Sequence, residues 1–329
     1  MLRLYKTVKE KYNVQKNTNV SISKQPFTET IRLSIKTHFD GTLKGIDDEL
    51  VETQTYVSVS TSRIQINCVT YDEDSVILKH QLRKTIIRLQ TVSDLLSIPN
   101  VVIWFVASPA KRLLPTKGLI SPVHINGGFT YITNHNIYIY RCEEFPKVMM
   151  HELLHNSKLH LESWGNENMT RLKTVFNVDA SVNLIPNEAV VEAWAEIFHT
   201  AMLCIELKLP VANHYKMMTI EATWARSRAI KMLDSRPPNS LWEENTSAFS
   251  YIMIRGSIIR DVNAFVKLYD SVVTPEVLTD FMIEAFHTAA FTNKNEIKNN
   301  NLNNKNTNAS ITIPSRLHNS LRMTWFGDL

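Results

Sequence analysis

Two histidines stand four residues apart, with a glutamate directly after the first, in the segment His151-Glu-Leu-Leu-His155. Side chains at positions i and i+4 project from the same face of a helix, so both imidazoles can bind one metal ion. Glu152 then lies beside the open position of the metal, where a carboxylate can accept a proton from metal-bound water. This spacing predicts a zinc site with hydrolytic chemistry.

A third protein ligand is needed, because two histidines rarely hold a catalytic zinc ion. A downstream histidine would belong three residues after a glycine in His-Glu-x-x-His-x-x-Gly-x-x-His, but Leu161 occupies that position and His160 misses it by one residue. Glutamates on a second helix are the other option. Glu188, Glu192 and Glu196 recur every four residues among apolar side chains. Successive carboxylates on such a face stand roughly 6 Å apart along the helix axis, so all three cannot bind one ion.

The two motifs together resemble the gluzincin group of zinc metallopeptidases, of which thermolysin is the familiar member. The resemblance rests on the His-Glu-x-x-His segment and on Asn187-Glu188-x-x-x-Glu192. It implies that Glu188 is the third zinc ligand and that Glu192 supports the imidazole of His151. Two features depart from the thermolysin pattern, because the gap between His155 and Glu188 is longer and Glu192 replaces the usual aspartate.

The same resemblance implies two further parts of a peptidase site. Peptidases of this kind use a tyrosine or histidine to stabilise the oxyanion, and Tyr251 follows Glu188 by 63 positions, a separation similar to that of the family's late donor. A buried structural tyrosine is the alternative interpretation. The strand expected over Phe129–Ile132 could pair with an extended peptide, although any hairpin would show the same pattern.

Four other segments are similar to uncharacterised metallopeptidase-like proteins of large cytoplasmic DNA viruses. They are Trp104 to Pro115, Gly127-Gly-Phe-Thr-Tyr, Arg141-Cys-Glu-Glu-Phe and Phe249-Ser-Tyr251. The tract 293–310 holds nine asparagines in eighteen positions, which fits an AT-rich genome of that kind. The resemblance implies an intracellular protein, located in the host cytoplasm or in the virion.

The elements that must position these residues follow from hydrophobic periodicity. Alternating residues over 55–72 and around a polar turn in 129–140 predict strand pairs, and the apolar run over 100–106 predicts a buried strand. Helical spacing covers the following ranges: 75–98, 146–160, 186–207, 211–233, 241–269 and 275–289. These elements predict an α+β fold, and the resemblance implies that it is zincin-like, with a small mixed sheet lobe before a mainly helical lobe and the metal in the cleft between them.

Five regions are expected along the chain. Residues 1–25 carry six basic side chains against one acidic one and predict a flexible basic arm. Residues 26–140 form the α/β lobe with its edge hairpin, and residues 141–292 form the helical lobe with the zinc site. The asparagine-rich tract 293–310 cannot bury a core and predicts disorder. Residues 311–329 regain apolar side chains and are expected to dock back onto the protein.

Composition excludes several classes of function. A net charge of +4 without a basic stripe does not indicate a nucleic-acid partner. Three cysteines are too few for a disulfide framework and favour a reducing compartment. The most apolar long segment, Ala189 to Leu209, contains five charged or titratable side chains, so no membrane span is expected. Neither glycine-rich phosphate-binding motif occurs in the chain.

The sequence thus predicts a zinc metallopeptidase that binds one Zn²⁺ per chain and acts on a peptide or protein substrate. One alternative is a catalytically silent structural or virion protein that zinc stabilises. A lesser alternative is a di-iron carboxylate protein, because Glu152-x-x-His155 and Glu196-x-x-His199 both have the Glu-x-x-His spacing found in such sites. The oligomeric state is left open by these patterns.

Overall fold

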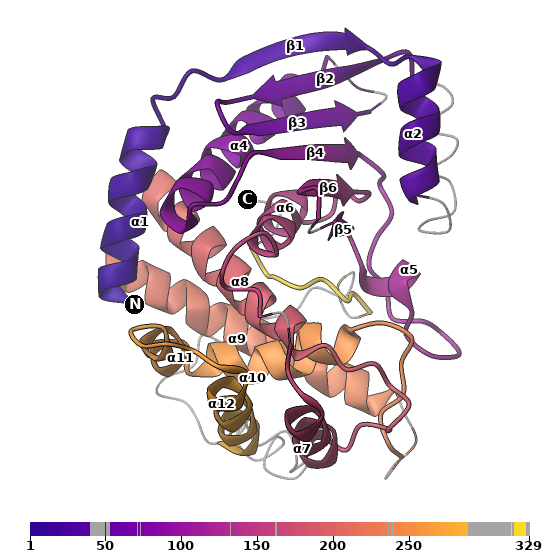
Figure 1. Ribbon diagram of the computed structural model, residues 1–329, viewed down its shortest axis with the longest axis vertical. Coiled ribbons are helices and arrows are strands. Elements are labelled where there is room, and N and C mark those ends of the chain that lie inside the picture. The colour runs from indigo at the N-terminus through magenta and orange to yellow at the C-terminus, as the bar shows by residue number, and fades with distance from the viewer. Residues whose placement is uncertain are drawn as a thin grey trace.

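The computed structural model has an α+β fold that is rich in helix (Figure 1). It describes residues 1–39, 50, 53–70, 72, 74–131, 133–161, 163–235, 237, 240–288, 317 and 319–326. In this part of the chain, a six-stranded mixed sheet is accompanied by eleven α-helices and one π-helical turn. The asparagine-rich tract, for which disorder is predicted, lies outside the described residues.

The strands are β1 (Ser21–Pro26), β2 (Thr55–Ser60), β3 (Ile64–Val69), β4 (Val101–Val106), β5 (Gly128–Tyr131) and β6 (Asn136–Ile139). Their order across the sheet is β1-β2-β3-β4-β6-β5. Strand β4 runs parallel to both β3 and β6, whereas the other neighbours are antiparallel. The predicted strand pairs and the buried strand are confirmed, and β5 forms the edge of the sheet that lies nearest the helices carrying the motifs (Figure 1).

The helices are α1 (Leu2–Gln15), α2 (Glu29–Phe39), α4 (Val76–Leu96), α5 (Pro122–Ile125), α6 (Phe145–Leu154), α7 (Asn166–Phe176), α8 (Pro186–Glu206), α9 (Val211–Asp234), η1 (Phe249–Ile254), α10 (Arg255–Arg260), α11 (Val262–Leu268) and α12 (Pro275–Thr288). The predicted helices over 75–98, 186–207, 211–233 and 275–289 are confirmed to within a few residues. In each of them, apolar residues recur with the helical period.

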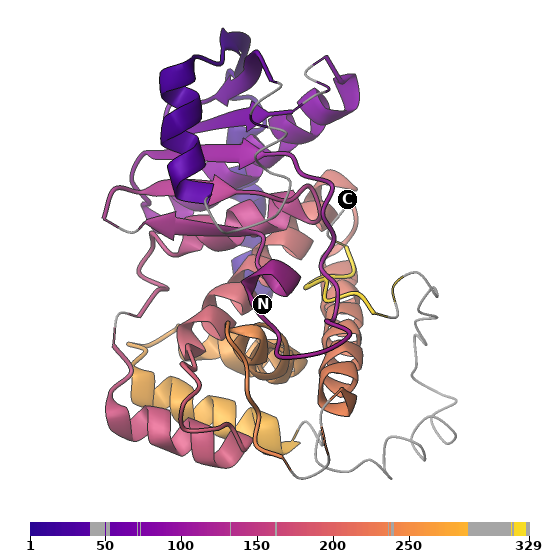
Figure 2. The ribbon, with the colours of Figure 1, turned by 90° about the vertical axis from the view of Figure 1, so that its right-hand side faces the viewer.

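The two faces of the sheet are covered by different helices. One face packs against α4 and α6 and shares a large core with them and with α8, whereas Phe39 of α2 packs against Tyr138 and Tyr140 on the opposite face. In β6, Ile137 and Ile139 alternate with these tyrosines, so the strand contributes to both cores. Figure 2 shows the sheet at one end of the molecule and α7 and α12 at the other.

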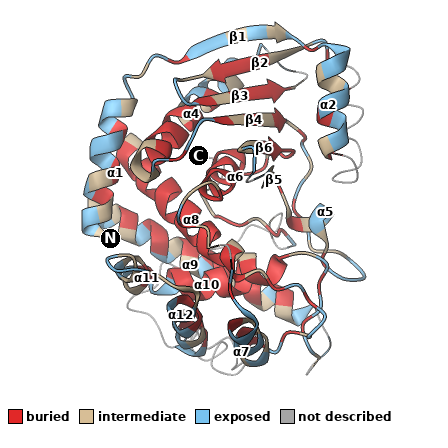
Figure 3. Ribbon diagram, viewed as in Figure 1, coloured by how far each residue is buried: buried red, intermediate tan, exposed pale blue. Residues whose placement is uncertain are grey.

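Helix α8 is buried over most of its length (Figure 3). Every residue from Ala189 to Ile205 is buried, including Glu192, Glu196 and His199. A helix that is buried all round must satisfy its polar side chains internally, because water cannot reach them. Glu192 and Glu196 therefore project among protein groups and not onto a solvated face.

The amino-terminal segment differs from its prediction. Residues 1–25 were expected to form a flexible arm, but they contain α1 and most of β1. Tyr5, Val8 and Tyr12 are buried on one face of α1, which packs against α4 and α8. This three-residue stripe has helical spacing, but the surrounding lysines obscure it in the sequence.

Two helical predictions are also corrected. The helix that carries His155 ends at Leu154 and not near His160, because the chain turns through backbone hydrogen bonds from Asn156 N to Leu153 O and from Ser157 N to Leu154 O. The single helix expected over 241–269 is divided into η1, α10 and α11, and its first residues are not helical. Helices α2, α5 and α7 were not predicted.

The carboxy-terminal residues 319–326 lie against the helical part of the molecule. Leu321 and Met323 are buried there, as the apolar pattern of 311–329 suggests. Within the described residues, no helix combines the length and the apolar character that a membrane crossing requires.

Candidate metal centre

Helix α6 presents the two motif histidines from a buried position. Its first turn follows Glu144, whose φ of 60° turns the chain sharply, and contains Pro146, which has no N–H to satisfy there. All ten helical residues are buried. His151 lies in the last turn of the helix. His155 directly follows its last residue, Leu154, as the C-cap.

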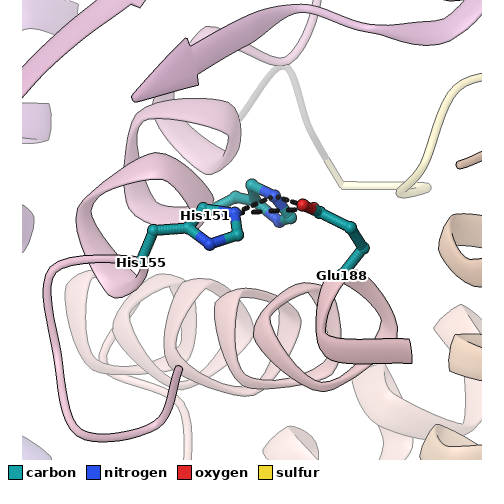
Figure 4. Close-up of side chains that lie close together, drawn as sticks. All are labelled: His151, His155 and Glu188. Atoms are coloured by element: carbon teal, nitrogen blue, oxygen red, sulfur yellow. Dashed lines mark hydrogen bonds and ion pairs between the residues drawn. The ribbon is translucent and has the colours of Figure 1, made fainter. Parts of the chain in front are cut away.

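The third group comes from the first turn of α8. Pro186 opens this helix, and Glu188 follows in its first turn with a side chain that is 16% exposed. Helices α6 and α8 pack against each other, so the carboxylate of Glu188 reaches the two imidazoles (Figure 4). The long gap between the motifs is occupied by α7 and its flanking turns.

Three potential ligand atoms converge at this point. Glu188 Oε2 lies 3.0 Å from His151 Nε2 and 3.4 Å from His155 Nε2, and the two histidine nitrogens are 3.1 Å apart (Figure 4). Ligands held about 2.05 Å from a tetrahedral zinc ion stand about 3.3 Å from each other. The three separations therefore match the edges of a tetrahedron around Zn²⁺. In the described part of the chain, this is the group of histidine, cysteine and acidic residues that could hold a metal ion.

The electrostatics of the cluster also favour a cation. Burial lowers the pKa of His151 to about 4, so this imidazole is neutral near pH 7. Burial opposes the charged form of His155 as well, but the neighbouring Glu188 outweighs it and raises the pKa of His155. Burial would raise the pKa of Glu188, yet the two histidines hold it well below its usual value. Two imidazoles and a carboxylate at this distance form a donor set that suits a divalent metal.

Glu152 faces a small cavity beside the cluster. The cavity has a volume of about 20 Å³, which is room for roughly one water molecule. Its lining includes His151, Glu152, Tyr251 and the pair Gly127-Gly128. Burial raises the pKa of Glu152 to about 8, although His155 partly opposes this shift.

Glu192 lies behind His151, on the side away from Glu188. Its Oε2 is 2.8 Å from His151 Nδ1, out of line for a well-formed hydrogen bond, and its other oxygen forms a buried ion pair with Lys147. Lys147 lies one turn before His151 on α6. The carboxylate of Glu192 therefore contacts Nδ1 of His151, whereas Nε2 of the same ring faces Glu188. The gluzincin resemblance implies such a contact for this position.

The other member of the glutamate series lies deeper in the core. Glu196 Oε2 accepts a hydrogen bond from Arg255 Nη1 at 3.1 Å, and both side chains are fully buried. His199 Nε2 donates to the carbonyl of Phe326 at 3.3 Å. The second Glu-x-x-His motif therefore does not join the first at one site, which removes the basis of the di-iron alternative.

Tyr251 lies next to the cluster, as expected, but on the π-helical turn η1. Its ring centroid is 5.8 Å from that of His151, and its hydroxyl lies near the carboxylate of Glu188. Burial raises the pKa of Tyr251 well above its usual value, so the phenol keeps its proton. A π-helical turn commonly marks a functional site, because it displaces a side chain from its α-helical position.

Two parts of the centre were not predicted from the sequence. His160 Nδ1 lies 2.8 Å from His155 Nδ1, and Asn187 Nδ2 lies 2.7 Å from the same atom of His160. Gly127 and Gly128 line the cavity beside the site. Gly128 approaches the candidate base closely, since a Cβ on this residue would lie 3.4 Å from Glu152 Cγ. The glycine pair was visible as a sequence feature, whereas the position of His160 depends on the early end of α6.

Comparisons with protein-family models, with curated proteins and with solved structures find no match to this chain.

Proposed function

We propose that the protein is a zinc-dependent peptidase of the gluzincin type. The observation that carries this proposal is the convergence of His151, His155 and Glu188 at tetrahedral spacing, directly beside the cavity that Glu152 faces. Such a centre would hold one Zn²⁺ per chain and leave one coordination position open. When bound, the zinc ion would polarise the peptide carbonyl and lower the pKa of a coordinated water.

Glu152 is the general base in this proposal. Its carboxylate is buried in the cavity, where it can accept a proton from the attacking water and transfer it to the leaving nitrogen. Burial raises its pKa to about 8, which would leave it protonated at neutral pH. A dication bound next to it would favour the charged form, so metal binding and base function are coupled.

Tyr251 is the hydrogen-bond donor in this proposal. Its phenol remains protonated because burial raises its pKa, so it can donate to the oxygen that becomes negative during the reaction. Its hydroxyl lies near the Glu188 carboxylate, at the edge of the ligand cluster. Tyr251 and Glu152 also line the same cavity, from the different elements η1 and α6.

The peptide would bind along β5, and the centre would lie in a zincin-like cleft between the sheet and the helices. Strand β5 pairs with β6 on one side, and no other described strand pairs with its second edge. Gly128 begins β5 and approaches Glu152, so a peptide that extends the sheet would pass the base. This arrangement supports an extended peptide or protein segment as the substrate.

The variant Glu152→Gln tests the proposal. Glutamine keeps the shape of the side chain but cannot accept the proton, so we expect zinc content to stay near one equivalent while cleavage of a peptide library falls by about 10²- to 10⁴-fold. Zinc is measured by elemental analysis, and cleavage is followed by mass spectrometry. A variant that cleaves as fast as the wild type would contradict the assigned base.

The same experiment separates the catalytically silent alternative. A wild-type protein that holds one zinc ion but cleaves no peptide in the library would favour a zinc-stabilised structural protein. A protein that binds no zinc at micromolar metal would contradict both functions. His151→Ala serves as the metal-free reference, because it removes one of the three ligands.

A further inference from the structure

His160 contacts His155, one of the three candidate ligands, on the side of the ring that faces away from the other two. Its Nδ1 lies 2.8 Å from Nδ1 of His155, whereas the ligand atom of His155 is the opposite ring nitrogen, Nε2. His160 therefore cannot bind the same ion as His155 through this nitrogen. Its ring packs at 63° to that of His155, with 5.0 Å between the centroids.

The orientation of the neighbouring Asn187 amide is fixed by the backbone. The N–H of Leu161 donates to Asn187 Oδ1 at 3.0 Å, so the other end of the amide must be the NH₂ group. This group lies 2.7 Å from His160 Nδ1. Since an amide NH₂ can only donate, His160 Nδ1 must be an acceptor and carries no proton.

This assignment determines the tautomer of His155. Two unprotonated nitrogens at 2.8 Å would repel each other, so the contact is a hydrogen bond only if His155 Nδ1 carries the proton. In the neutral ring, which metal binding requires, His155 Nε2 then has a free lone pair, and this is the atom that faces His151 Nε2 and Glu188 Oε2. Asn187 Nδ2 and His155 Nδ1 thus share one acceptor on His160.

We propose that His160 is a positioning residue, which holds His155 in the tautomer and ring orientation that metal binding requires. Through Asn187 it also joins the end of α6 to the start of α8, so that the residue preceding Glu188 is fixed relative to His155. The inference rests on the proposed metal centre. It assigns to His160 a role that the spacing of the sequence motifs does not contain.

A purely structural role for His160 has a different signature. The turn after α6 is held by backbone hydrogen bonds, including one from His160 N to Ser157 O at 3.0 Å. These bonds do not use the imidazole. Loss of the ring nitrogen should therefore affect the metal more than the fold, whereas a packing role would affect stability and depend on ring shape.

Three variants separate these roles. His160→Phe keeps an aromatic ring but removes the acceptor, and we expect zinc affinity to fall about 10- to 100-fold, the usual effect of losing a partner of a ligating histidine. His160→Asn places an amide oxygen close to the position of Nδ1 and should restore most of the affinity. His38→Phe is the matched control, since this half-buried histidine packs against Tyr131 and Tyr138 on the other side of the sheet.

Zinc affinity is measured by competition with a chromophoric chelator, and thermal unfolding of the metal-free proteins is measured in parallel. Nitrogen-15 NMR of histidine-labelled, metal-free protein provides a second readout, because it distinguishes a protonated Nδ1 from a protonated Nε2. We expect Nδ1 of His155 to be protonated in the wild type and in His160→Asn, and this preference to be lost in His160→Phe.

The outcomes distinguish this inference from the proposed function. If the wild type binds zinc and His160→Phe binds it equally well, the positioning role is wrong and the metal centre stands. If His160→Asn is as weak as His160→Phe while all metal-free proteins unfold alike, the acceptor is not the feature that matters, and the inference fails. A wild type that binds no zinc would overturn the metal centre itself.

Discussion

At the residue scale, three glutamates with the same spacing on one helix have three different environments. Glu188, at the start of α8, meets the two histidines, Glu192 contacts the far side of His151, and Glu196 pairs with Arg255 in the core. The spacing of four residues predicts a shared face and excludes a shared metal ion. It cannot rank the three, because the ranking depends on where the helix is placed against α6.

Glu152 and Glu244 show that a perturbed carboxyl is not by itself a functional one. Burial raises the pKa of each to about 8. Glu152 faces the metal cluster, whereas Glu244 accepts hydrogen bonds from Phe249 N at the start of η1, at 2.9 and 3.2 Å. Geometry and not the pKa distinguishes a candidate base from a structural acid.

The raised pKa of Glu244 predicts a pH dependence of stability. Its ordinary value is 4.5, so between about pH 4.5 and 8 the folded protein holds a proton at this site that the unfolded chain releases. The free energy of unfolding should therefore fall as the pH rises through this window, by up to about 1.4 kcal/mol per pH unit from this group. Glu244→Gln removes this contribution and should become more stable, relative to the wild type, as the pH rises from 5 to 8.

The measurement is denaturant unfolding of both proteins at several pH values. Other buried carboxyls contribute to the slope of each protein, but they cancel in the difference. A constant difference between the two proteins across this range would show that Glu244 titrates normally in the folded state.

At the scale of elements, the sequence predicts a helix or strand correctly where its apolar residues recur with a single period along the whole element. The two strand pairs, the buried strand β4 and the long helices α4, α8 and α9 all have such patterns. The sequence was uninformative where tertiary contacts override local preference. The stripe of α1 is hidden among lysines, and the π-helical turn that carries Tyr251 depends on packing against α8 and α9.

For the candidate site, the motif predicted the residues that meet but not their supports. His151, His155 and Glu188 bring three potential ligand atoms together, and Glu152 lines the cavity beside them with His151. His160 lies one position before the one that a third histidine ligand would occupy, so the motif spacing gives it no role. Its contact with His155 arises because α6 ends at Leu154, and an element boundary is the feature that periodicity determines least well.

The close approach of β5 to α6 leads to a prediction about Gly128. A Cβ at this position would lie 2.6 Å from Ile139 Cδ1, 2.8 Å from the carbonyl oxygen of Tyr138 and 3.4 Å from Glu152 Cγ. Because one of these atoms belongs to the backbone, β5 must shift away from its neighbours in Gly128→Ala. We expect a loss of about 1 to 3 kcal/mol in stability and a lower rate of peptide cleavage, while zinc content stays near one equivalent.

Gly118→Ala is the control for this change. Gly118 has a φ of 80°, but no atom lies within 4 Å of the point that a Cβ would occupy, so the substitution strains the backbone without crowding the site. It should lower stability and leave cleavage by the folded protein unchanged. If both variants reduced cleavage equally, the approach of β5 to Glu152 would not be the cause.

At the scale of the whole molecule, the carboxy-terminal segment connects the helices around the centre. Glu144, which precedes α6, accepts hydrogen bonds from Met323 N and Thr324 N. Met323 also lines the cavity that contains Glu152. The last described residues of the chain therefore reach the helix that carries His151 and Glu152, although more than 160 positions separate them in the sequence.

Glu221 on α9 depends on the same segment. Its fully buried carboxyl group, whose pKa burial raises well above its usual value, accepts hydrogen bonds from Thr324 Oγ1 and from the N–H groups of Trp325 and Phe326, the latter two at distances of 2.9 to 3.1 Å. Arg228, two turns further along α9, donates to the carbonyls of Leu317 and Ser320. A buried acid whose described partners all come from one segment is a liability if that segment is absent.

Deletion of residues 317–329 should therefore destabilise the helical part of the molecule. Leaving a buried polar group without its partners costs about 1 to 3 kcal/mol, and a loss of 3 kcal/mol in a chain of this size corresponds to a fall of roughly 4 °C in Tm. Because the segment also holds Glu144 at the start of α6, zinc affinity should fall as well. Thermal unfolding and chelator competition measure the two effects.

A synthetic peptide of residues 317–329, added in trans, should restore both properties to the truncated protein. Glu221→Met is the matched variant in the full-length chain, because its side chain is similar in length and has no carboxyl group to accept the N–H groups of Trp325 and Phe326. In that background the deletion should cost less, since no buried carboxyl group is left without its partners. If the truncated wild type unfolded at the same temperature as the intact chain, the segment would be an accessory to the fold, and Glu221 would have to find partners elsewhere.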